Sequence, residues 1–182
     1  MTLRMDASLI TIVLVGLLLT AAVYDFYKHK IPNYISLGGW ILAPSLYAAF
    51  FGVDGCLDSI YGLGLILLLT FPLYALHWMG AGDVKLMASV GAFVGVKSAL
   101  LTLLFIVLSG AVFSVLFYIY QRSLSVTLNR LLAMASMSSS FRKPVYIPPT
   151  DSTSRVVIPY AIPIAIGTVL YLFYANWEIH SL

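Results

Sequence analysis

The sequence predicts an all-α, polytopic membrane protein with about six transmembrane helices. Three observations predict it: the composition, a series of uncharged apolar runs, and an uneven distribution of basic residues. Of the 182 residues, 61% are hydrophobic and only 9% are charged, whereas charged residues make up about a quarter of an ordinary soluble domain. Most of the runs approach the ~20 residues that a helix needs to cross a bilayer. The whole chain, 1–182, is therefore expected to form one integral-membrane domain.

Six apolar runs are expected to be the spans. The fourth run is short, because Lys85 and Lys97 bound it; a short span and a re-entrant segment both fit, and we expect a span. Gly91 and Gly95 in this run form a G-x-x-x-G pattern, which favours close approach of two helix backbones. The runs cover residues 7–24, 35–51, 59–77, 86–96, 98–120 and 156–175.

Basic residues predict the orientation of these spans. Eight of the ten lysines and arginines fall on one side of the expected membrane, and only Arg4 and Lys97 fall on the other. Since cytoplasmic loops carry the excess of basic residues, both termini are expected outside and the eight-residue side in the cytoplasm. The eight are Lys28, Lys30, Lys85, Arg122, Arg130, Arg142, Lys143 and Arg155.

One long polar connection, residues 121–155, joins the last two runs. Its first part has leucines at helical spacing and is expected to lie on the cytoplasmic leaflet, while its proline-containing remainder is expected to be a loop. The net charge of +3 suggests contact with lipid headgroups rather than with nucleic acid. The single cysteine, Cys56, excludes an internal disulfide and a cysteine-rich zinc site.

Two aspartates stand where an apolar run meets a basic flank. Asp25 follows the first run, and Asp83 lies in Gly80-Ala81-Gly82-Asp83-Val84-Lys85. Ionisable groups are costly at the edge of the hydrocarbon, so both are candidate functional residues. Two carboxyl groups that share a proton can provide an acid and a base, as aspartic proteases require. Gly80 and Gly82 leave room for a substrate backbone beside Asp83, and Lys85 is expected to tune the local field or to anchor a headgroup.

Three stretches give the chain a resemblance to the type IV prepilin peptidases, membrane aspartic proteases of the GxGD group. The first stretch is Asp25-Phe26-Tyr27-Lys28-His29-Lys30-Ile31-Pro32-Asn33, and the second is Gly80 to Lys85. The third is Pro159-Tyr160-Ala161-Ile162-Pro163 with Gly167. The resemblance extends over residues 7–175 and implies that Asp25 and Asp83 are the catalytic pair.

The resemblance also implies a substrate and a location. Such an enzyme would sit in the inner (cytoplasmic) membrane as a multi-pass protein and would cut the short basic leader from a prepilin or pseudopilin at the cytoplasmic face. The paired CxxC motifs of the bifunctional members are not found here, so the chain resembles the short, peptidase-only Tad/Flp-type branch without methyltransferase activity.

Three alternatives remain open at this stage. A preflagellin peptidase of the same type would differ only in substrate. A proton-coupled transporter would also use membrane carboxylates, and a non-catalytic assembly subunit would use the aspartates structurally. His29 and His77 do not match a recognisable metal site, so neither a metal nor another cofactor is expected. The oligomeric state and the identity of the pilin are left open by the sequence.

Overall fold

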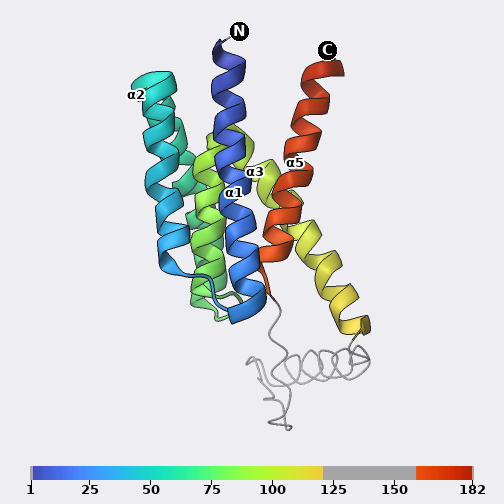
Figure 1. The fold of residues 1–182 in the computed structure, drawn as a ribbon. Coiled ribbons are helices and arrows are strands. Elements are labelled where there is room, and N and C mark those ends of the chain that lie inside the picture. The colour runs from blue at the N-terminus through green and yellow to red at the C-terminus, as the bar shows by residue number, and fades with distance from the viewer. Residues whose placement is uncertain (1, 121–158, 182) are drawn as a thin grey trace, which may run out of the picture. The chain divides into compact units, whose positions relative to one another are not determined.

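The computed structural model describes residues 2–120 and 159–181. Their elements are all helices: α1 (Thr2–Lys28), α2 (Asn33–Ala75), α3 (Ala81–Tyr120) and α5 (Ala161–Ser181) (Figure 1). Three helical segments are long and apolar enough to cross a membrane, namely Ser8–Lys28, Asn33–Ala75 and Ala81–Phe117. The apolar part of α5, Ala161–Trp177, is shorter. The prediction of an all-α membrane protein is therefore confirmed for this part of the chain.

The expected count of about six spans is not what the structure shows, because single glycines join neighbouring runs into longer elements. Gly52 interrupts α2 with φ 70° and ψ −157°, and Gly95 interrupts α3 with φ 75° and ψ 168°. A positive φ is readily adopted only by glycine. Helix α2 thus consists of stretches 33–51 and 53–75, and α3 of stretches 81–94 and 96–120. The break at Gly52 falls between the second and third predicted runs, and the break at Gly95 falls near the end of the fourth.

The chain forms two compact units. Residues 1–110 and 159–182 make up the first, and residues 111–158 make up the second. The described part of the second unit is the end of α3, where the rings of Phe113 and Phe117 stack with their centroids 6.2 Å apart. The predicted surface helix and loop within 121–155 lie outside the described residues.

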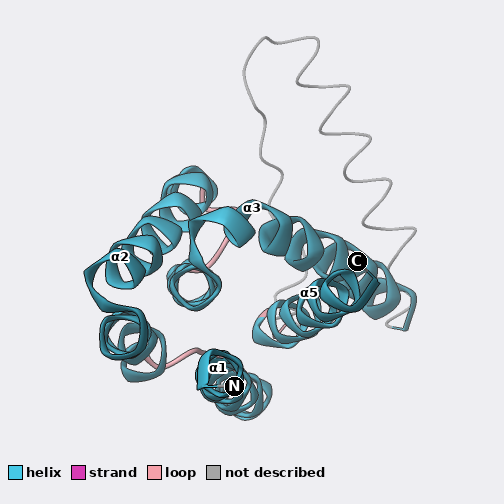
Figure 2. Ribbon diagram, turned by 90° about the horizontal axis from the view of Figure 1, so that it is seen from above, coloured by secondary structure: helices cyan, strands magenta, loops and turns pink. Residues whose placement is uncertain are grey.

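The first unit is packed around the stretch 81–94 (Figure 2). Nearly all of its residues from Val84 to Phe93 are buried, and both stretches of α2 contact it. Helix α1 packs against α2 and α5. At 1.5 Å per residue the stretch is about 21 Å long, which is shorter than the ~30 Å hydrocarbon layer.

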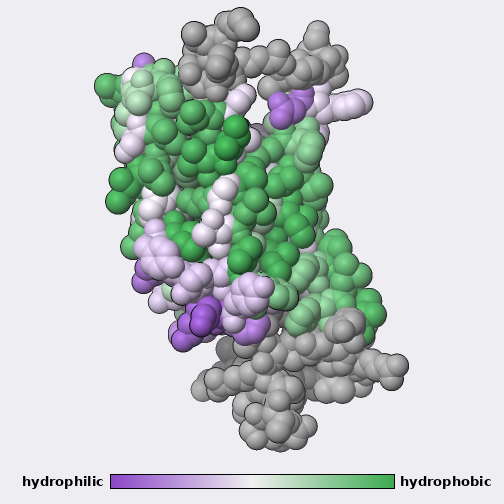
Figure 3. All heavy atoms as spheres, viewed as in Figure 1, coloured by the Kyte–Doolittle hydropathy of each residue, from purple (hydrophilic) through white to green (hydrophobic). Residues whose placement is uncertain are grey.

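Small and hydroxyl side chains fill the interior of this unit, while large apolar side chains cover its outside. Serines and threonines at 36, 59, 70, 89, 102 and 168 are buried, but Leu68, Phe173 and Trp177 are exposed. Figure 3 shows hydrophobic side chains spread over the helices and hydrophilic ones gathered toward their ends. This distribution suits helices that pack closely in lipid.

One close helix crossing, between α2 and α3, uses three glycines. A Cβ on Gly62 of α2 would overlap the backbone oxygen of Gly91 and would lie 2.8 Å from the carbonyl carbon of Gly95. The G-x-x-x-G pattern at Gly91 and Gly95 therefore mediates the close backbone approach that the sequence predicted.

Replacing Gly62 with alanine is expected to lower the free energy of unfolding by about 1–3 kcal/mol, because the added methyl group has no room between two backbones. Gly64 is the matched control, since a Cβ there would meet nothing within 4 Å. Thermal unfolding in detergent measures both variants. A Gly62→Ala protein as stable as Gly64→Ala would contradict the tight crossing.

Candidate functional site

The two aspartates lie at the same end of the first unit. Asp25 is near the end of α1, and Asp83 is in the first turn of α3. In Figure 1 this end is opposite the labelled N- and C-termini. The carboxyl groups are close enough for the charge of Asp25 to act on Asp83. The structure thus brings together the two residues that the sequence singled out.

Asp25 is buried, with 5% of its surface exposed. Its Oδ2 accepts a hydrogen bond of 3.0 Å from the backbone N–H of Ala161, the first residue of α5. The first N–H groups of a helix have no partner within the helix, and the positive end of the helix dipole favours a carboxylate there. The last helix therefore stabilises and orients a side chain from the first.

A turn in the left-handed region follows Asp25. His29 has φ 51°, and its N–H donates to the Asp25 carbonyl oxygen at 2.8 Å. Such a residue commonly ends a helix. The chain therefore leaves α1 after Lys28, three residues past Asp25, and starts the short connection to α2.

Asp83 is held at the start of its own helix. The Val84 N–H donates to the Gly80 oxygen at 3.2 Å, so Gly80 is the N-cap and Asp83 is the third residue of the helix. The Asp83 carboxyl group accepts a hydrogen bond from the Gly80 backbone, as the acidic residue of a capping box does. Asp83 remains partly exposed, so it can be reached from outside the bundle.

The two glycines of this turn leave room for residues of the protein itself. A Cβ on Gly80 would lie 2.9 Å from Oδ2 of Asp83, and one on Gly82 would lie 3.2 Å from the Cβ of Ile31. The sequence predicted room for a substrate backbone at both positions. In the structure the Asp83 carboxyl group lies beside Gly80 and Ile31 lies beside Gly82, and the approach of a substrate backbone to Asp83 stays a prediction.

Lys85 has a partner that the sequence argument did not identify. Its Nζ donates to Oδ1 of Asn33 at 3.0 Å, and its backbone oxygen accepts a hydrogen bond of 2.9 Å from Nε1 of Trp40. Asn33 and Ala161 both lie in stretches that carry the family resemblance, which was the available signal for them. Local spacing gave neither residue a role, because their partners are 52 and 136 positions away.

His29 and His77 are both exposed. Within 2–120 and 159–181, no group of three or more histidine, cysteine or acidic side chains could hold a metal ion. Whether the protein works without a cofactor therefore stays a prediction.

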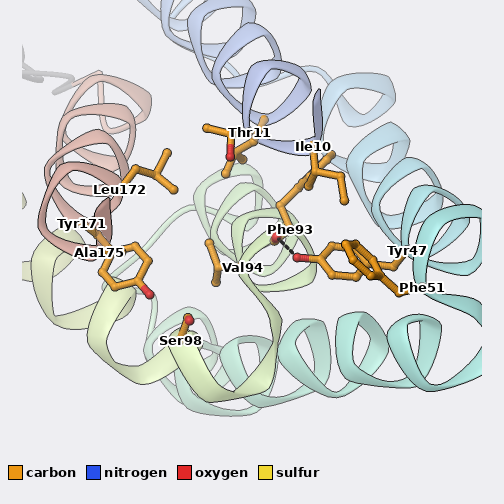
Figure 4. Close-up of a pocket in the computed structure, with 11 residues that line it drawn as sticks. Ile10, Thr11, Tyr47, Phe51, Phe93, Val94, Ser98, Tyr171, Leu172 and Ala175 are labelled. Carbon is orange, nitrogen blue, oxygen red and sulfur yellow. Dashed lines mark hydrogen bonds between the residues drawn. The ribbon is translucent and has the colours of Figure 1, made fainter. Parts of the chain in front are cut away.

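A cavity of about 200 Å³ lies away from the aspartates, among α1, α2, α3 and α5 (Figure 4). Leu14 and Phe93 in its wall are at least ten residues from Asp25 and Asp83 along their helices, or about 15 Å. The Tyr47 hydroxyl donates to the Phe93 oxygen at 2.7 Å in this wall. Its lining is Ile10, Thr11, Leu14, Tyr47, Phe51, Phe93, Val94, Ser98, Tyr171, Leu172 and Ala175.

Comparison with known protein families identifies a family whose model matches this chain. A model of the type IV leader peptidase family matches residues 12–115, which is more than half of the chain and includes both aspartates. No curated protein and no solved structure matches the chain.

Proposed function

Because the chain belongs to the type IV leader peptidase family, we propose that it is a membrane aspartic endopeptidase acting on prepilin-like precursors. It removes their short basic leader at the cytoplasmic membrane face, for assembly of a pilus or a secretion system. The observation that carries the proposal is the pairing of Asp25 and Asp83 at one end of the helices, inside the matched region. The function of the family and the pair of carboxyl groups thus support the same reaction, hydrolysis of a peptide bond.

The pair performs hydrolysis with one proton between two carboxyl groups. The ionised carboxylate takes a proton from water as the water oxygen attacks the scissile carbonyl carbon, and the protonated carboxyl group gives its proton to the carbonyl oxygen. When the tetrahedral intermediate collapses, the C–N bond breaks, and the leaving nitrogen takes the proton that the first carboxyl group removed from water. A hydroxyl group of the intermediate returns its proton to the other carboxylate, so both carboxyl groups regain their starting states. Asp25 keeps Oδ1 for this exchange, since Oδ2 accepts the bond from Ala161. Gly80, Gly82 and Lys85 support the site by positioning Asp83.

The direct test is cleavage of a pilin precursor by the protein in liposomes, followed by mass spectrometry. The proposal expects a mass loss equal to the leader and no added methyl group when S-adenosylmethionine is supplied. An intact precursor would refute the assignment. A preflagellin precursor in a parallel reaction separates the two family substrates, whereas the transporter alternative predicts no cleavage of either precursor.

The proposal places the aspartate end in the cytoplasm. Lys28, Lys30 and Lys85 all lie at this end, next to the two aspartates, and cytoplasmic connections carry the excess of basic residues. The breaks at Gly52 and Gly95 would then let α2 and α3 each cross the membrane twice. With α1 and α5, this gives the six spans of the proposal.

Cysteine labelling tests this topology. In a Cys56→Ser background, cysteines at positions 30 and 142 are expected to react only from the cytoplasm, and a cysteine at position 54 only from outside. Labelling after permeabilisation serves as the control that each thiol is reactive. The opposite pattern would place the aspartates away from a cytoplasmic leader.

A further inference from the structure

The N-terminal parts of α2 and α3 are joined by a line of polar contacts, which we name the α2–α3 seam. Lys85 Nζ donates to Asn33 Oδ1 at 3.0 Å, Trp40 Nε1 donates to the Lys85 oxygen at 2.9 Å, and Ser89 Oγ donates to the Ser36 oxygen at 2.6 Å. The seam therefore consists of Asn33, Ser36, Trp40, Lys85 and Ser89. It connects the N-terminal parts of two helices that are far apart in the sequence.

The seam lies next to both aspartates along the chain. Lys85 is two residues after Asp83, and Asn33 follows Asp25 by eight residues, across the short connection between α1 and α2. Ile31 in that connection lies against Gly82, since a Cβ on Gly82 would be 3.2 Å from the Ile31 Cβ. A shift of the Asn33 end relative to Lys85 would therefore change how Asp25 faces Asp83.

The two ends of the seam differ in burial. Ser36 and Ser89 are fully buried, and a Cβ on Gly39 would lie 2.8 Å from the Ser89 Cβ, so the inner end belongs to the packed core. Asn33 is exposed and Lys85 is half-buried, so the outer end is in contact with the surroundings. Removing the outer hydrogen bond leaves both groups accessible to water, so it is expected to change the unfolding temperature little.

We propose that Asn33 and Lys85 are a positioning pair, whose hydrogen bond holds the Asp83 turn against the segment after Asp25 and thereby sets the relation of the two carboxyl groups. The inference rests on the proposed peptidase function and adds Asn33 to the residues on which the reaction depends. Neither side chain touches the substrate in this proposal. Misplacement of reacting groups by about 1 Å can cost on the order of 100-fold in rate, which is far more than the bond contributes to folding.

Steady-state kinetics with the liposome-embedded protein tests the pair. Asn33→Ala and Lys85→Met are each expected to lower kcat by about 10- to 100-fold with KM changed less than about twofold. The double variant should be no slower than the slower single variant, because both remove the same interaction. Asn33→Asp should restore most of the rate, since a carboxylate accepts the same bond from Lys85. Lys97→Met, near the break at Gly95 in the same helix, is the matched control and should keep the wild-type rate.

Two kinetic outcomes would overturn the proposal. Wild-type kcat in Asn33→Ala would show that the hydrogen bond does not matter. A raised KM with unchanged kcat in Lys85→Met would assign Lys85 to substrate binding instead.

A distance measurement tests the positioning without relying on activity. Spin labels replace Tyr27 and Trp78, which are 74% and 75% exposed and lie in the stretches before the seam, in a Cys56→Ser background. Asn33→Ala and Lys85→Met should each shift or broaden the distance distribution measured by electron paramagnetic resonance, while Lys97→Met should not. An unchanged distribution would overturn the proposal even if activity falls. A shifted distribution in a protein that cleaves no precursor would instead refute the proposed function alone.

Discussion

Replacing either Asp25 or Asp83 with asparagine is expected to lower precursor cleavage by at least about 1,000-fold while the protein still inserts and folds. The amide oxygen of asparagine can still accept the Ala161 N–H at position 25 and the Gly80 N–H at position 83, so the contacts that hold each side chain persist. An amide cannot exchange a proton with water or with a carbonyl oxygen. The loss should therefore be one of chemistry rather than of structure.

Cleavage rates and thermal unfolding of the same preparations check this expectation. Asp54→Asn is the matched control, because Asp54 is an exposed carboxylate close to the break in α2. Equal unfolding temperatures with cleavage lost only at positions 25 and 83 would support the aspartyl mechanism. Substantial cleavage by either purified variant would exclude it.

The second large effect concerns the substrate. A precursor with its apolar segment intact should be cleaved at least about 100-fold faster, in kcat/KM, than a soluble peptide spanning the same bond. Both aspartates lie at the end of the helices, so a bond must be held at that depth, and an apolar helix in the same bilayer holds it there. The soluble peptide loses this contribution to positioning.

The comparison requires one enzyme preparation in liposomes and both substrates at matched concentrations. A third substrate has the same length as the intact precursor, but serines replace several apolar residues of its segment. It is the control for length. Equal rates for the membrane-held and soluble substrates would show that a local pocket recognises the leader, for instance one that includes residues 121–155.

The sequence was sufficient for the features that local chemistry determines. Apolar runs predicted the helices, and the position of Asp25 and Asp83 at the ends of such runs predicted that they would share one end. The spacing of Gly91 and Gly95 predicted a close helix crossing, which Gly62 completes. Each of these inferences depends on a pattern within a few turns of helix.

What the sequence did not predict depends on contacts between distant segments. Nothing local indicates that α2 and α3 each break at a single glycine, Gly52 or Gly95, since glycine is common in membrane helices. The partners of Lys85 and Asp25, Asn33 and the Ala161 N–H, become visible only once the helices are side by side. The neighbours of Gly80 and Gly82, which are Asp83 and Ile31, likewise could not be read from local spacing.

The hydrogen bond between Asp25 and Ala161 has a consequence for the order of events during synthesis. Asp25 emerges from the ribosome before the backbone group that orients it, because that group belongs to α5, 136 residues later. A nascent chain that has inserted both aspartates still lacks this partner, so the finished geometry awaits insertion of α5. A nascent chain that stops before α5 therefore carries the two carboxyl groups without the hydrogen bond that orients Asp25.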